Sequence, residues 1–435
     1  MEINMQPESR LTDSLLGVNE LSYQMPPSLG IATQARHRQE FAQINSYTVS
    51  SGGGGQTVVF DSQTGSSFVD PKASYYVFNI SHTSPVVPVG WGSGSVANII
   101  NTVTVRSRTG KEIGRYENFN LLCKYMDRVN ESQEFLSATL KAQGYSVPAS
   151  SGTQYSDDVP PTGKTYILRM SSIPCFNPVN CKMLPPQLME GLRVEFRLEA
   201  SVIAFCPNSA TPFNPAIPFT YTVNRPSVQY KCYDLADAFA RQIAMVASKS
   251  GLRLLHKEIF HTITSTSGSQ SNYDLKKAAS KALNCMIVLR DTANTTATDV
   301  DCFASKVNDI LRYQANIGSV YWPNQPLTIP AVTDYYESYY YSMYGAGKIY
   351  GAFPSSLTPE QWAGSGDLKT YNNNFIMINL NSSNTSDLVG ATVNNSRALL
   401  IDVLRNTSGT EVRFDSFLTH LRATTVFTSN VTVLD

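Results

Sequence analysis

The histidines are the first residues to consider for chemistry, because histidine can bind a metal ion or transfer a proton near neutral pH. The chain has five, and the closest pair is His256 and His261. Both lie in a segment with the pattern of a β-strand, where a separation of five places two side chains on opposite faces. The His-Glu-x-x-His spacing of zinc proteases is absent, and so is the His-x-His pair of cupin-type metal enzymes. We therefore predict no metal site.

Other motifs of enzymes and cofactor sites are incomplete. Gly163, Lys164 and Thr165 resemble the end of a phosphate-binding loop, but Asp158 stands where that motif needs a glycine. A strand pattern follows these residues instead of a helix, which indicates a turn. The seven cysteines contain no Cys-x-x-Cys pair for structural zinc, and no Gly-x-Ser-x-Gly elbow lies at a strand-to-helix turn. We predict no catalytic residue and no cofactor, and we expect that the chain is not an enzyme.

A cluster of tyrosines is the most unusual segment. Six of them lie within ten residues: Tyr335, Tyr336, Tyr339, Tyr340, Tyr341 and Tyr344. Tyrosine is enriched at interfaces because its ring is apolar and its hydroxyl can meet water. We predict a loop insertion whose tyrosines contact another subunit or form an exposed binding platform. The alternative is that the loop packs on its own domain. Stacking on nucleic acid is least favoured, because Lys348 is the only basic residue nearby.

The composition excludes some classes of protein. The 435 residues include 34 basic and 34 acidic side chains, so the formal net charge is zero. This balance argues against a protein whose whole surface binds nucleic acid or an anionic membrane. We find no signal peptide and no run of about 18 apolar residues, so we expect an intracellular protein with reduced cysteines. Whether Cys175 and Cys181 ever pair stays open.

Alternation of apolar and polar residues dominates the chain. Residues 192–199 are the clearest case, with apolar side chains at even positions and charged ones at odd positions. Further strands are predicted at 75–80, 99–106, 165–170, 219–223, 284–289, 375–380, 399–404 and 431–434. Helical spacing occurs near 118–130 and 234–250. Short strands joined by long loops favour antiparallel sandwiches over a βαβ fold.

The order of strong segments is duplicated. Segments at 74–80, 101–107, 191–200 and 219–226 have counterparts at 283–291, 308–314, 397–406 and 422–430. The offset is roughly one domain length, about 200 residues. We predict an all-β fold of two tandem antiparallel sandwiches, with short helices in loops. The predicted organisation is an N-terminal arm (1–40), a first sandwich (41–233), a linking helix (234–250) and a second sandwich (251–435).

Several segments together resemble one protein family. In the first half they are PPSLGIATQARHRQEFAQINSYTVSS, FVDPKASYYVFNISHT, GSVANIINTVTVRSRTGKEIGRYENFNLL and LMEGLRVEFRLEA. In the second half they are GLRLLHKEIFHTITS, KALNCMIVLRDT and ANIGSVYWPNQPL. They resemble the double jelly-roll major capsid proteins of DNA viruses, in particular those of polinton-like viruses, adintovirus-like elements and virophages. The resemblance covers about residues 25–435.

This resemblance implies a fold and a function. Each sandwich would be an eight-stranded jelly roll, and three chains would form a homotrimeric, pseudo-hexagonal capsomer that tiles an icosahedral virion capsid. The protein would be made and assembled inside the host cell. Its partners would be further copies, minor capsid proteins and penton proteins, without specific binding of nucleic acid. Residues 1–40 would reach neighbouring trimers, minor capsid proteins or an internal membrane.

Two other interpretations stay open. The first is a binding module, such as a viral vertex or spike protein, that recognises carbohydrate or a receptor through tandem β-sandwiches. It predicts an exposed aromatic platform and no stable trimer. The second is an enzyme on tandem β-barrels, which predicts stoichiometric metal in the purified protein.

Overall fold

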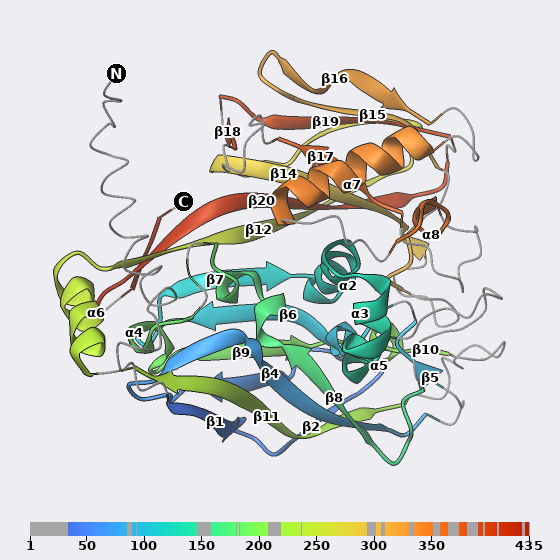
Figure 1. Ribbon diagram of the computed structural model, residues 1–435. Coiled ribbons are helices and arrows are strands. Elements are labelled where there is room, and N and C mark those ends of the chain that lie inside the picture. Colours follow the sequence, from blue (N-terminus) through green and yellow to red (C-terminus); the bar gives the residue numbers. More distant parts are fainter. Residues whose placement is uncertain are drawn as a thin grey trace, which may run out of the picture.

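The structure is a computed structural model. It describes residues 34–84, 89–92, 94–145, 158–179, 181, 183–207, 219–235, 237–293, 302–305, 309–329, 335–350, 357–363, 374–380, 390–394, 396–406, 409–428 and 431–434. The strands are arranged in two blocks that follow one another along the chain (Figure 1).

The first block consists of two packed antiparallel sheets. One has the order β1 (Gln34–Phe41), β11 (Tyr221–Asp234), β4 (Phe68–His82) and β8 (Lys164–Arg169), and β2 (Ser46–Val49) also pairs with β11. The other has the order β3 (Thr57–Asp61), β9 (Arg193–Leu198), β6 (Ile100–Arg106) and β7 (Glu112–Glu117). A two-stranded ribbon joins β5 (Val89–Gly90) to β10 (Cys206–Pro207). Because β4 occupies one side of β11, β1 and β2 share the other side as two halves of one edge strand.

The second block repeats this arrangement. One sheet has the order β12 (Leu252–Thr266), β20 (Val412–Val426), β14 (Ala279–Asp291) and β17 (Ile376–Asn379). The short strands β18 (Ala391–Val393) and β21 (Val431–Leu434) pair with β14 and β20. The other sheet has the order β13 (Gln270–Asp274), β19 (Leu399–Arg405), β15 (Ile310–Ile317) and β16 (Val320–Thr328).

The two blocks share one topology when β1 and β2 are counted as a single strand and the short strands β5, β10, β18 and β21 are left out. In each, the first strand pairs with the eighth, the eighth with the third and the third with the sixth. The second sheet of each block has the order second, seventh, fourth, fifth. This order defines a jelly roll. The predicted all-β fold of two tandem jelly rolls is therefore confirmed.

Alternation along the strands builds the cores. In β9, Val194, Phe196 and Leu198 are buried while Arg193 and Arg197 are exposed, as predicted. Phe196 packs edge-on against Tyr76 of the opposite sheet, with ring centroids 4.8 Å apart. Such contacts between facing aromatic rings close the first sandwich.

Helices lie mainly in the connections. The longer ones are α2 (Phe119–Asn130), α6 (Asp237–Lys249) and α7 (Tyr336–Tyr350). The shorter ones are α3 (Gln133–Ala138), α4 (Pro186–Met189), α5 (Ser201–Ala204) and α8 (Pro359–Ala363), with 3₁₀ turns at Val96–Ile99, Leu140–Gln143, Met170–Ser172 and Pro174–Phe176. The helices α2 and α7 follow the fifth strand of their own rolls and contact each other. Among the described residues no helix is both long and apolar enough to cross a bilayer.

Two details differ from the sequence-based expectations. The predicted arm, 1–40, ends inside a sheet, because Gln34–Phe41 forms β1 and pairs with β11. Residues 1–33 lie outside the described residues.

The prediction of a loop at the tyrosine cluster is wrong, since Tyr336 to Tyr344 lie in helix α7. The helix expected at 234–250 is α6, and β11 extends to Asp234 before it. The boundaries between the two predicted sandwiches stay a prediction.

Candidate functional site

Of the six predicted tyrosines, five lie in α7 and Tyr335 directly precedes it, and they divide between an inward and an outward side. Tyr339 packs edge-on against Trp362, with ring centroids 5.9 Å apart, and its hydroxyl donates to the carbonyl of Leu357 at 2.9 Å. Tyr335, just before the helix, also lies against Trp362, and Tyr341 packs on the core of the second roll. These three tyrosines fit the alternative in which the segment packs on its own domain.

The other three tyrosines face outward. Tyr336, Tyr340 and Tyr344 are 54%, 66% and 37% exposed. Their spacing of four residues places them on one side of the helix. The rings of Tyr340 and Tyr344 stack, with centroids 6.2 Å apart. We call these three residues the tyrosine stripe. It is an exposed aromatic surface on an otherwise anchored helix.

Small polar residues anchor α7 to the second roll. The hydroxyl groups of Ser338 and Tyr313 lie 3.0 Å apart, and the backbone N–H of Met377 donates to Oγ of Ser342 at 3.2 Å. Both serines are fully buried. The predicted structure here was a loop insertion, and the preference of tyrosine for strands gives no sign of a helix. The available signal was the spacing of Ser338, Ser342 and Met343, which places three buried residues on one helical face.

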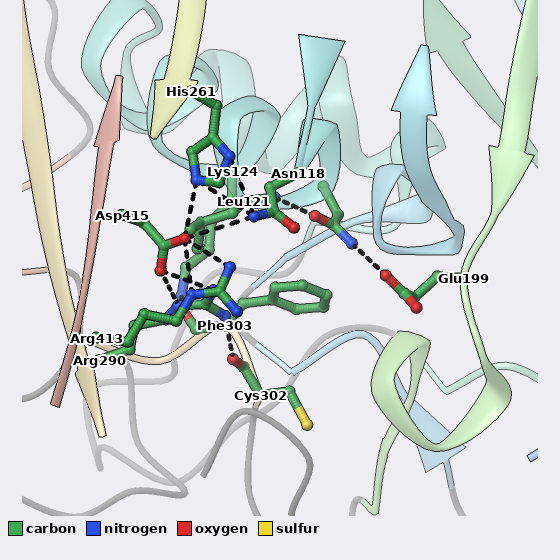
Figure 2. Close-up of polar contacts among 11 residues, drawn as sticks. Asn118, Leu121, Lys124, Glu199, His261, Arg290, Cys302, Phe303, Arg413 and Asp415 are labelled. Atoms are coloured by element: carbon green, nitrogen blue, oxygen red, sulfur yellow. Dashed lines mark hydrogen bonds and ion pairs between the residues drawn. The ribbon is translucent and has the colours of Figure 1, made fainter. Parts of the chain in front are cut away.

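A buried polar cluster joins the two rolls, centred on Asp415 of β20 (Figure 2). Its Oδ2 accepts from Nε of Arg290 at 2.8 Å, and its Oδ1 accepts from the guanidinium of Arg413 at 2.8 Å. Nε2 of His261 lies 2.9 Å from the same Oδ1. From the first roll, Nδ2 of Asn118 reaches this oxygen at 3.4 Å. Four side chains thus converge on one carboxylate.

The charge state of Asp415 follows from these contacts. Burial alone would raise the pKa of this carboxyl group. The charge of Arg290, the hydrogen bond with His261 and the charge of Arg413 together hold the pKa well below its usual range. Asp415 is therefore an ionised, fully partnered group, as buried charges usually are.

Helix α2 adds a second link beside this cluster. The ammonium of buried Lys124 donates to the carbonyl of Phe303 at 2.6 Å. Nη1 of Arg290 donates to the neighbouring carbonyl of Cys302 at 2.9 Å. A segment of the second roll is thus held from both sides, by a lysine of the first roll and an arginine of the second (Figure 2).

A third link runs along β12. The hydroxyl of Tyr116 donates to Oε2 of Glu258 at 2.8 Å, and Nη1 of Arg422 donates to the carbonyl of Ile113 at 3.2 Å. The N–H of Val179 donates to the carbonyl of Leu255 at 2.6 Å. These bonds cross between the rolls, and apart from the exposed Val179 the residues that make them are buried or partly buried. These bonds add direct contacts between the two rolls to the covalent link through α6.

The other residues considered for chemistry in the sequence are the histidines, Gly163 and the cysteines, and their contacts in the structure are those of packing and turns. Nε2 of His256 lies 2.9 Å from Oγ1 of Thr424, and burial lowers the pKa of this histidine to about 3. Gly163 lies in a turn that leads into β8, as predicted. All seven cysteines are buried and unpaired with one another, and burial raises the pKa of Cys181 to about 12. Among the described residues, no three acidic, histidine or cysteine side chains are grouped as metal ligands.

Comparison with protein-family models and with curated protein sequences finds no match. Solved structures do match. The crystal structure of PBCV-1 VP54, fitted into a reconstruction of the virophage Sputnik, has a TM-score of 0.60 at 10% identity and covers 93% of this chain and 97% of its own. The Faustovirus major capsid protein has a TM-score of 0.58 at 8% identity, covering 97% and 99%. The mavirus major capsid protein has a TM-score of 0.53 at 9% identity, covering 95% and 94%. Over nearly its whole length, this chain therefore has the double jelly-roll fold of these viral capsid proteins.

Proposed function

We propose that this chain is a structural major capsid protein, which trimerises into pseudo-hexagonal capsomers that tile an icosahedral virion shell. The observation that carries the proposal is the duplication of one eight-strand order in two joined rolls. Three copies around a threefold axis would place six similar rolls in a ring, which gives a nearly hexagonal outline. The fold shared with viral capsid proteins supports the same role.

The hydrogen bonds between the two rolls support a structural role in a shell. A shell subunit must keep its two halves in fixed orientation, because every lattice contact depends on their geometry. The hydrogen bonds of Asn118 to Asp415 and of Lys124 to the carbonyl of Phe303 are contacts of this kind between the two rolls. The long strand β11 is paired with β1 on one edge and with β4 on the other, so neither edge is free to pair with another chain.

The tyrosine stripe is the surface we propose for contact between copies. Three exposed tyrosines on an anchored helix supply large area at a small entropy cost, since each side chain has few rotatable bonds. Charged residues are only 16% of the chain, and the cores of interfaces are depleted in charge. Minor capsid proteins, penton proteins and an internal membrane are further proposed partners of the assembled shell.

The first test is the solution mass of the purified chain by light scattering. The proposal expects three times the 47.8 kDa of one chain, and hexagonal particles of that mass by negative-stain microscopy. A monomer at every concentration, together with binding to glycan arrays through the tyrosine stripe, would favour the vertex or spike protein instead. Stoichiometric metal with hydrolytic or oxidative activity would favour the enzyme.

A further inference from the structure

A cavity of about 500 Å³ lies at one end of the molecule, and the sheets and helices around it do not fill it. Its apolar lining comes from separate elements: Phe68 of β4, Leu188 of α4, Ala240 and Ala244 of α6, Phe427 after β20, and Val431 of β21. Arg108, Glu190 and Arg241 also line it. Cavities of this size accept a ligand or a few side chains, since pockets for small molecules measure roughly 300–1,000 Å³.

The described chain begins beside this cavity. Gln34 pairs with Asp234, which lies three residues before α6 begins. The carboxylate of Asp234 accepts a 2.6 Å hydrogen bond from Ser67 and forms an ion pair with Arg36. Ser67 lies between Ser66 and Phe68, which both line the cavity. The first strand therefore enters the fold next to the cavity.

The sequence immediately before Gln34 suits an apolar pocket. None of residues 21–33 is charged, and the stretch Met25 to Ile31 reads Met-Pro-Pro-Ser-Leu-Gly-Ile. Two consecutive prolines favour an extended conformation before binding, which reduces the entropy lost on docking. An extended chain spans about 3.3–3.6 Å per residue, so Ile31 lies within roughly 10 Å of Gln34. These residues can reach the cavity without crossing the molecule.

We infer that residues 25–31 dock in this cavity of their own chain, with Leu29 and Ile31 against Phe68, Leu188 and Ala244. The occupant is thus a segment of the same molecule, chosen by its reach, its lack of charge and its apolar side chains. Docking there buries apolar surface and fixes where residues 1–24 leave the fold. This inference does not depend on the proposed capsid function.

Disulfide trapping in the full-length chain tests the docking. The variant Leu29→Cys/Ala244→Cys is oxidised mildly, and the linked peptides are identified by mass spectrometry after proteolysis. The control, Leu29→Cys/Met245→Cys, moves the second cysteine by one residue, to an exposed position that does not line the cavity. We expect an intrachain disulfide that forms at least tenfold faster than in the control. Equal rates, or a disulfide that links two chains, would overturn the inference.

A second measurement avoids engineered cysteines. Ala244→Arg places a long charged side chain in the cavity, and Met245→Arg places the same side chain on the exposed side of α6. We expect chymotrypsin to cleave after Tyr23 or Leu29 several-fold faster in Ala244→Arg than in Met245→Arg, with unchanged melting temperatures. Equal cleavage would contradict docking. Should Ala244→Arg unfold the protein, the cysteine pair decides the question.

Discussion

The hydroxyl of Tyr116 donates a 2.8 Å hydrogen bond to Oε2 of Glu258, which joins β7 of the first roll to β12 of the second. The same hydroxyl accepts from the N–H of Cys175 at 3.0 Å. Tyr116→Phe removes both bonds and leaves a buried carboxylate with one donor fewer. We expect a loss of about 1.5–3 kcal/mol in the free energy of unfolding, measured by chemical denaturation.

Tyr76→Phe is the matched control for this substitution. Tyr76 is also fully buried in the first roll, but its hydroxyl has no hydrogen-bond partner among the described residues. Removing an unpaired buried hydroxyl is close to neutral or stabilising. Equal losses in the two variants would show that the Tyr116–Glu258 bond contributes nothing beyond packing.

Asp415→Asn tests the buried charge cluster of the second roll, which Asn118 of the first roll contacts. The substitution keeps the shape of the side chain but leaves Arg290 and Arg413 without their shared negative partner. Breaking a buried ion pair by removing one partner costs about 3–5 kcal/mol. We expect a loss of this size in denaturant titrations.

Asp402→Asn provides the comparison. Its pair with Arg312 spans 3.2 Å, but both side chains are about one-third exposed. Ion pairs that are exposed to solvent contribute about 0–1 kcal/mol to the free energy of unfolding. If Asp402→Asn costs as much as Asp415→Asn, burial is not what gives the Asp415 cluster its strength.

Much of the fold follows from the sequence, because strand burial leaves a local pattern. The alternation at 192–199 predicted β9, and helical spacing predicted α2 and α6. The duplicated order paired 74–80 with 283–291 and 191–200 with 397–406. These segments lie in equivalent strands, β4 with β14 and β9 with β19.

The site is less visible in the sequence, because it depends on contacts between distant residues. Asn118 and Asp415 are 297 positions apart, and no spacing rule relates them. The tyrosine segment was predicted as a loop since its anchor, Trp362, belongs to a later helix. Tertiary packing on Trp362 and Tyr313 overrides the strand preference of tyrosine there.

His256 predicts a dependence of stability on pH. Burial, with the positive charge of nearby Arg422, lowers the pKa of this histidine to about 3 from 6.5. Glu258 lies 3.6 Å from Nδ1, but Arg422 and Tyr116 already compensate its charge. Between these two pKa values the unfolded chain binds a proton that the folded chain does not. Stability therefore falls as the pH falls, by about 1.4 kcal/mol per unit.

His256→Gln should flatten this dependence between pH 6 and pH 4.5. In this window the lowered pKa of Asp415 has little effect, because its stabilisation is lost only below about pH 4. His82, whose pKa is also lowered by burial, contributes equally in both proteins. The measurement is the urea midpoint against pH, and parallel curves for the two proteins would contradict the prediction.

The tyrosine stripe predicts separate effects on assembly and on folding. Tyr336→Ala with Tyr340→Ala removes exposed rings, so we expect the proposed trimer to weaken by about 2 kcal/mol or more and the stability of the chain to change little. Tyr339→Ala removes a ring packed on Trp362, so the fold itself should lose about 1–3 kcal/mol. Light scattering over a dilution series, with denaturation of each variant, checks both. A trimer unaffected by the double substitution would leave α7 with a purely internal role.

Truncations at the amino terminus separate the first strand from the segment before it. Deleting residues 1–24 should leave the melting temperature unchanged, because neither β1 nor the docking segment is lost. Deleting residues 1–40 removes nearly all of β1 and uncovers β11 from Val228 to Asp234. Backbone hydrogen bonds contribute about 1 kcal/mol each and strand ordering offsets part of this, so we expect a loss of roughly 2–4 kcal/mol. Deleting residues 1–33 keeps the strand, so its loss should be smaller. If it equals that of the longest deletion, then β1 adds nothing to stability, and the edge strand of the first roll begins at β2.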